Sequence, residues 1–222
     1  TSTVMGIGCM TKDDPYYISA VGALGEGSSN SLSKDTDLAL AIGTKLADFT
    51  TGSWANFENP NFKLVSVNTA RYDTTKHLAT PVISDAKVGL QKISEALGDW
   101  KAPDDWYKRA IKEKNEWDAY VEKQSGPTNQ EEPSYAHAVG AVYRNSDPSD
   151  IVVTAAGGLV GEVVQVWKPK QLNTFETEWG FSCMGYEISG ALGIKMAKPD
   201  QDVVVFVGDG SYLLNNTDIY SS

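Results

Sequence analysis

An apolar run that ends in a glycine turn constrains the fold of this chain most strongly. Residues 203–207 read VVVFV, and Gly208, Asp209, Gly210 and Ser211 follow directly. A continuous apolar run is typical of a parallel strand that is covered on both faces. A helical pattern begins at the glycine turn, so the segment predicts a strand, a tight turn and a helix. Ligands of α/β sheets bind at such carboxyl ends of strands.

The turn itself suits a metal–phosphate site. Its glycines let the backbone approach a ligand, and the N–H groups at the start of a helix favour phosphate. Asp209 offers a hard carboxylate oxygen to Mg²⁺. A plain strand-to-helix turn with Asp209 as the cap is the alternative, and it is the favoured interpretation for so short a motif taken alone.

The same succession recurs along the chain. Residues 151–156 (IVVTAA) run into Gly157 and Gly158, and residues 37–42 (DLALAI) end at Gly43. Residues 62–68 and 81–84 are further strand patterns. We therefore predict an α/β protein whose parallel-sheet domains carry flanking helices.

Helix signals lie between these strands. Asp85 is placed to cap a helix that carries Val88, Ile93 and Leu97 on one face. Residues 102–123 form a charged helical pattern, and a further helix is predicted from Pro133 to about residue 145. Three other segments are predicted without regular helix: residues 3–8 as a short strand entering a loop, residues 20–33 as a loop with at most one helical turn, and residues 49–54 as a polar loop.

Composition excludes several classes of function. The formal net charge of −10 argues against a surface for nucleic acid or anionic membrane. No apolar run reaches membrane-spanning length and no signal peptide is visible. Cys9 and Cys183 show no pairing pattern, so we predict two buried, reduced thiols in a cytoplasmic protein. His77 and His137 lie outside any ligand cluster and are predicted to be structural.

Four segments together resemble a known family. They read DLALAIGTKLADFTTGSW, TAAGGLVGE, FSCMGYEISGALGIKMA and VGDGSYLLNN. Their combination is similar to the thiamine-diphosphate-dependent enzymes, and within them to the hydrolases of inositol catabolism that open a cyclic 1,2-diketone by C–C cleavage. The resemblance covers most of the chain from about Asp37.

The resemblance implies roles for individual residues. Asp209 matches the aspartate that binds Mg²⁺, and Gly210 and Ser211 match positions that contact the phosphates. Met184 matches the bulky residue that holds the cofactor in its bent shape, and Gly157 opens the loop that lines the pyrimidine and diphosphate. The implied cofactor-binding positions are Gly157, Gly158, Leu159, Cys183, Met184, Gly185, Gly208, Gly210 and Ser211.

The resemblance also implies domains and partners. Residues 1–123 match most of a central domain, residues 124–132 a linker, and residues 133–222 the first half of the cofactor domain. Both ends of the chain look cut, and the full-length enzyme is expected to be a homo-oligomer that acts on a small polyol-derived diketone.

The family's second metal ligand is an asparagine well over twenty residues beyond the glycine turn. Asn215 and Asn216 lie too close to it and are predicted to be helix residues. The activating glutamate lies outside this chain, so no catalytic residue is assigned and the fragment alone is expected to be inactive. A carboligase similar to acetohydroxyacid synthase and a non-catalytic α/β assembly module are the alternatives.

Overall fold

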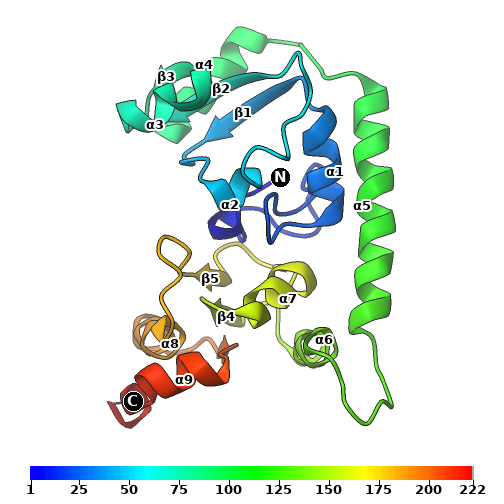
Figure 1. The fold of residues 1–222 in the computed structure, drawn as a ribbon. Helices are drawn as coiled ribbons and strands as arrows, with labels where there is room; N and C mark the ends of the chain where they lie inside the picture. Colours follow the sequence, from blue (N-terminus) through cyan, green and yellow to red (C-terminus); the bar gives the residue numbers. More distant parts are fainter. Residues whose placement is uncertain (222) are drawn as a thin grey trace.

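The computed structural model describes residues 1–221 of the chain. Within these residues lie two three-stranded parallel sheets, each with helices packed against it (Figure 1). The predicted α/β class is therefore confirmed. No helix of the described part is long and apolar enough to cross a membrane.

The first sheet contains three of the strands that the sequence predicted in the first half of the chain, those at residues 37–42, 62–68 and 81–84. Its order is β1-β2-β3, and Leu40 of β1 pairs with Val65 of β2 in a parallel register. Gly89 of α4 packs against this sheet so closely that an added Cβ would lie 2.8 Å from a methyl group of Val67. The elements of this part are β1 (Leu38–Ile42), α2 (Asp48–Thr51), β2 (Lys63–Asn68), α3 (Arg71–Thr75), a 3-10 helix (Lys76–Leu78), β3 (Thr80–Ile83) and α4 (Ala86–Leu97).

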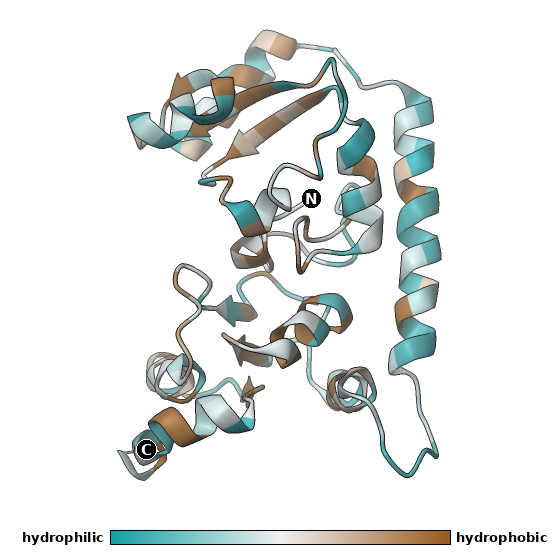
Figure 2. Cartoon of the chain, in the orientation of Figure 1, coloured by the Kyte–Doolittle hydropathy of each residue, from teal (hydrophilic) through white to brown (hydrophobic). Residues whose placement is uncertain are grey.

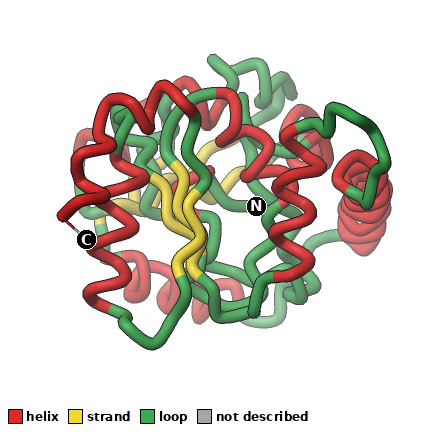
Figure 3. The backbone as a smooth tube through the Cα atoms, turned by 90° about the horizontal axis from the view of Figure 1, so that it is seen from below, coloured by secondary structure: helices red, strands yellow, loops and turns green. Residues whose placement is uncertain are grey.

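The second sheet has the order β5-β4-β6, with β4 paired in parallel to both neighbours. Seen from below, its strands lie between helices on either side (Figure 3). The elements of this part are α6 (Tyr135–Asn145), β4 (Ile151–Thr154), α7 (Gly158–Val166), β5 (Phe175–Thr177), α8 (Tyr186–Ala197), β6 (Val203–Val205), α9 (Asp209–Asn215) and a 3-10 helix (Asn216–Ser221).

The strand β6 differs from its prediction. The sequence indicated a strand covered on both faces, but β6 lies at the edge of its sheet and Val205 is 37% exposed. All four residues of β4 are buried, because β4 is the central strand. The apolar run correctly predicted a strand, and the position in the sheet decided its burial.

The helix α5 (Asp104–Ser125) runs along one side of the molecule (Figure 1). Its surface is mostly hydrophilic, with a few apolar positions (Figure 2). Val121, one of those positions, is buried in the largest core cluster. Val4 and Ile7 from the start of the chain enter the same cluster, together with Val152 and Phe175 of the second sheet. This core contains residues from both predicted domains, and the domain boundaries themselves remain a prediction.

Three segments are more helical than predicted. A 3-10 helix (Val4–Gly6) replaces the expected strand, α2 occupies part of the expected polar loop, and α1 (Gly27–Asp35) replaces the expected loop. In α1, tertiary contacts override weak helix propensity. Ser29 bonds Ser19 through their hydroxyls at 3.1 Å, and Asn30 exchanges two hydrogen bonds of 2.9 Å with the backbone of Gly22.

The helix caps and histidines mostly follow the predictions. Asp85 caps α4 by accepting bonds from the backbone N–H groups of Lys87 and Val88 at 2.9 and 3.2 Å. The helix expected from Pro133 begins two residues later, after the N-cap Ser134. His137 completes a capping box with that serine, and the ring of His77 packs on Trp54. Both histidines therefore have the predicted structural contacts.

The prediction of two buried thiols was wrong. Cys9 and Cys183 are both free, but both are exposed. Cys183 lies in the loop that precedes α8, where the chain turns at the edge of the second sheet.

Candidate functional site

Three helices of the described chain begin at glycines in the second half. Gly157 is the N-cap of α7, Gly185 of α8 and Gly208 of α9. The helices α7 and α9 follow the neighbouring strands β4 and β6, so their turns leave the same edge of the sheet. Within residues 1–221 no side chain caps any of the three helices. The first backbone N–H groups of α7 are therefore available to a ligand, whereas in α9 the N–H of Gly210 is already bonded to Oδ1 of Asp209 and in α8 the N–H of Tyr186 is bonded to the carbonyl of Cys183.

The turn at Gly157 forms an open cradle. Its backbone has φ of 90° and ψ of −177°, a conformation that essentially only glycine adopts. A Cβ added at Gly157 or at Gly158 would meet no atom within 4 Å. The backbone is therefore accessible where a diphosphate would approach it. Leu159, the third position predicted in this loop, is half-buried and packs against the main core.

The fold brings Met184 to the glycine turn at residues 208–211. A Cβ added at Gly210 would lie 3.0 Å from Cε of Met184, so the two predicted positions meet across 26 residues of sequence. The side chain of Met184 is 49% exposed, which leaves part of the thioether free to touch a ligand. The absence of a side chain at Gly210 makes this approach possible.

Asp209 stands at the exposed edge of the same turn. Its Oδ1 accepts a hydrogen bond of 2.8 Å from the backbone N–H of Gly210. The next residue, Ser211, is buried. In the part of the chain that the structure describes, no three His, Cys, Asp or Glu side chains gather into a metal cluster. Asp209 thus offers a single exposed carboxylate, which suits a Mg²⁺ ion that takes its other ligands from phosphate and water.

Glu187 is a site residue that the sequence prediction missed. Its side chain is 0% exposed, and its two oxygens accept bonds from different turns. Oε1 accepts from the N–H of Ala156 at 3.2 Å, and Oε2 accepts from the N–H of Gly185 at 3.0 Å. A lone acid inside the otherwise apolar and small-residue pattern of this helix was the signal that could have found it.

Asn215 is a helix residue, as predicted, and it is tied to the start of α8. Its amide Nδ2 lies 2.9 Å from Oδ2 of Asp218, 3.2 Å from Oγ of Ser189 and 3.3 Å from the carbonyl oxygen of Gly185, so its two hydrogens are shared among three acceptors. Gly185 has φ of 96°, and a Cβ there would lie 2.8 Å from Cβ of Asn215. A glycine is required for both reasons.

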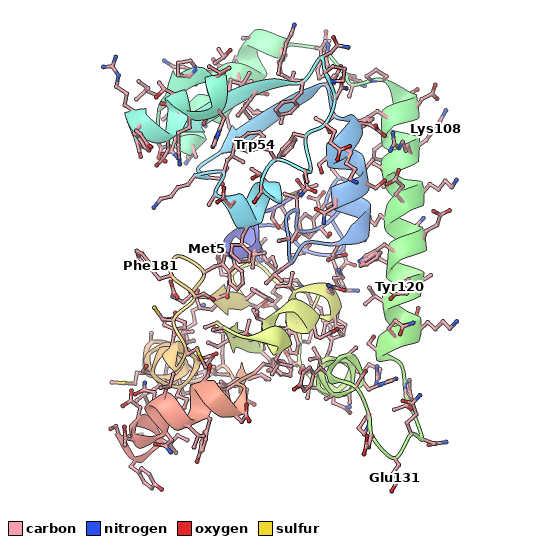
Figure 4. The ribbon with its side chains drawn as sticks, viewed as in Figure 1. Met5, Trp54, Lys108, Tyr120, Glu131 and Phe181 are labelled. Atoms are coloured by element: carbon pink, nitrogen blue, oxygen red, sulfur yellow. The ribbon has the colours of Figure 1, made fainter. Side chains whose placement is uncertain are left out.

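Glu178 organises the loop that carries Cys183 and Met184. Its carboxylate accepts from the backbone N–H groups of Phe181 at 2.9 Å and of Cys183 at 2.7 Å. These bonds, that of Cys183 first, lower the pKa of Glu178 below its usual value. Reduced hydration, and then the neighbouring carboxylate, raise the pKa of the Cys183 thiol. Phe181 projects from this loop away from the fold and is 91% exposed (Figure 4).

The residues present fit an anionic group that arrives with a divalent cation. The glycine cradle supplies backbone N–H donors at the start of α7, Asp209 supplies a metal ligand, and Met184 supplies an apolar contact beside Gly210. The structure brings Met184, Gly185, Gly208, Asp209 and Gly210 together. Leu159 and Ser211 are turned mainly to the core, and Cys183 is exposed beside Glu178.

Comparison with known proteins agrees with this arrangement. Residues 1–93 match the family model of the thiamine pyrophosphate enzyme central domain. Residues 155–221 match the model of the thiamine pyrophosphate enzyme C-terminal TPP binding domain. The second match contains all three glycine-capped helices, and together the two matches cover most of the chain.

Among similar curated proteins is the 3D-(3,5/4)-trihydroxycyclohexane-1,2-dione hydrolase of Geobacillus thermodenitrificans, which is 32% identical over 99% of this chain and 37% of that protein. The protein of the same name from Clostridium tetani is 35% identical over 92% of this chain and 36% of its own length. The chain thus spans little more than a third of these relatives. With both domains matched in the same order, the chain belongs to the thiamine pyrophosphate enzymes.

Proposed function

We propose that this chain carries one wall of the cofactor site of a hydrolase that opens a cyclic 1,2-diketone by C–C cleavage. The observation that carries the proposal is the meeting of Met184 with Gly210 beside an open glycine cradle. The relatives that share both domains bear the name of a trihydroxycyclohexane-1,2-dione hydrolase, which supports this substrate class. In the reaction, water adds OH to one carbon and H to the other as the ring bond breaks.

The residues of this chain bind and orient the cofactor in the proposed site. Asp209 holds Mg²⁺, and the backbone of Gly208, Gly210 and Ser211 lies against the phosphates. Gly157 and Gly158 let the loop before Leu159 approach the cofactor closely, because no side chain occupies that space. Met184 supports the cofactor through an apolar contact. Thiamine pyrophosphate itself supplies the electron sink for C–C cleavage.

Binding of cofactor by this wall is tested by calorimetric titration of the chain with thiamine pyrophosphate and Mg²⁺. We expect Asp209→Asn to weaken the Mg²⁺-dependent affinity by about tenfold or more, because loss of a charged ligand is worth on the order of 1.5–3 kcal/mol. Asp200→Asn, which removes a charge from the exposed turn after α8, is the matched control and should bind as the wild type does. Equal binding by the two variants would contradict the role of Asp209.

The substrate class is tested on the whole protein that contains this sequence. It is incubated with thiamine pyrophosphate, Mg²⁺ and either the trihydroxycyclohexane-1,2-dione or pyruvate, and the products are identified by NMR. We expect an open-chain acid from the dione and no carboligation product from pyruvate. Carboligation of pyruvate without dione cleavage would favour the carboligase instead. No product from either substrate would favour an assembly module. The molar mass of the same protein in solution tests the proposed homo-oligomer.

A further inference from the structure

We infer that Glu187 and Asn215 are positioning residues that tie the three glycine turns together and so fix Met184 against the phosphate turns. The inference deepens the proposed function and rests on it for the identity of the ligand. The hydrogen bonds on which it depends are all made between residues of this chain.

Glu187 connects the first turn to the second. It accepts from Ala156, the residue before the Gly157 cradle, and from Gly185, the residue after Met184. The two acceptors are oxygens of one buried carboxylate, so the spacing of the two backbone segments is set by the width of that group. The bonds are charge-assisted and therefore stronger than bonds between neutral groups. The carboxylate also lies in the first turn of α8, where the helix dipole favours a negative charge.

Asn215 connects the second turn to the third. It extends from α9, the helix that opens at Asp209, and donates to the carbonyl of Gly185. Gly185 therefore has its N–H held by Glu187 and its carbonyl held by Asn215. Few degrees of freedom remain to the peptide that carries Met184, because both hydrogen-bonding groups of the next residue are fixed.

The consequence is a defined place for the Met184 side chain. The neighbouring Gly185 is tied to the Gly157 turn through Glu187 and to α9 through Asn215, and these two sets of hydrogen bonds are the two clamps. Cε of Met184 reaches the space beside Gly210. Relaxing either clamp lets Met184 move relative to the turns that hold the phosphates. A ligand that contacts both the thioether and the phosphate turns then loses affinity, while the hydrophobic core below remains in place.

The test uses the chain with Glu187→Gln and Asn215→Ala, singly and combined. Gln keeps the shape of Glu187 but retains only one oxygen, so one of the two bonds is lost without a cavity. Calorimetry gives the dissociation constant for thiamine pyrophosphate with Mg²⁺, and NMR gives the hydrogen exchange of the Ala156 and Gly185 amides without cofactor. Glu162→Gln on α7 is the charge-matched control.

We expect each variant to bind the cofactor roughly tenfold more weakly, on the order expected for one lost charged or buried hydrogen bond. The Gly185 amide should exchange faster in Glu187→Gln, by more than the modest fall in the unfolding midpoint that the loss of a buried hydrogen bond brings. The double variant should lose less than the product of the two single effects, since both act through Gly185.

Wild-type affinity in both single variants would overturn the inference, and so would a loss of affinity that follows only a lower unfolding midpoint. If the wild-type chain binds no cofactor, the proposed function fails by itself. The amide exchange then decides the inference separately, because unchanged exchange at Ala156 and Gly185 shows that Glu187 does not hold the turns.

Discussion

Gly157 shows most directly how one residue shapes the site. Its φ of 90° lies in a region closed to side chains, whereas Gly158 next to it begins a regular helix. An added Cβ would have no atom within 4 Å at either position, so neither substitution causes crowding. A comparison of the two therefore measures the backbone strain alone.

We predict that Gly157→Ala lowers the free energy of unfolding by about 1–3 kcal/mol, the usual cost of a forced backbone conformation. Gly158→Ala should leave it within about 0.5 kcal/mol or raise it slightly, because alanine favours helix. Urea unfolding of the two variants beside the wild type measures both values. Equal losses in the two variants would show that the turn relaxes to a conformation open to alanine.

Part of the site could be predicted from single residues. Asp209, Gly210 and Met184 stand in short motifs whose spacing indicates a ligand, and the fold brings them together. Glu187 could not be predicted in this way. Its role depends on two backbone N–H groups, one of them 31 residues away, and no local pattern shows which amide a buried acid will meet.

At the scale of elements, the contrast between β4 and β6 can be measured. Both contain adjacent valines, but Val152 is fully buried in the centre of the sheet while Val205 is partly exposed at its edge. We predict that Val152→Ala lowers the free energy of unfolding by roughly 2 kcal/mol, from lost burial and a residual cavity. Val205→Ala should cost about 0.5 kcal/mol. Chemical denaturation tests both, and similar losses would mean that β6 is covered in solution.

The elements that sequence predicted best are those whose pattern is local. The strands β1 and β4 lie in apolar runs that end in glycine turns, β2 alternates between apolar and polar residues, and the cap of α4 is a single aspartate before an amphipathic helix. The helix α1 was missed because its Gly, Ser and Asn residues favour loops. They form a helix here through contacts with residues 19–22 that lie outside the helix itself. The strand β5 was missed because three residues carry too little pattern.

At the scale of the whole molecule, the first residues of the chain belong physically with its last part. Val4 and Ile7 share a core with Val152, and a buried ion pair joins Glu26 to Lys168 beyond α7. A division of the chain by sequence alone cannot see such contacts, because they depend on residues more than a hundred positions apart. The ion pair is also the place where this association should respond to pH.

Glu26 is 2% exposed, and its second oxygen, Oε2, has no hydrogen-bond partner among the described residues. Burial raises the pKa of Glu26 more than Lys168 lowers it. The folded protein therefore holds a proton on Glu26 more tightly than the unfolded chain does. It follows that the contribution of Glu26 to stability is greatest below the ordinary pKa of 4.5 and falls as the pH rises through the raised value.

We predict that Glu26→Gln gains stability relative to the wild type as the pH is raised above 4.5, because its amide cannot ionise. Urea unfolding of both proteins between about pH 4 and pH 7 gives the difference at each pH, in which the titration of other groups cancels. Gln91→Ala, at an exposed position of α4, changes no titratable group and should give a difference that does not change with pH. If the free energy of unfolding of the wild type instead rose relative to that of Glu26→Gln over this range, attraction to Lys168 would outweigh burial. The two parts of the chain would then be held together most firmly when the pair is charged.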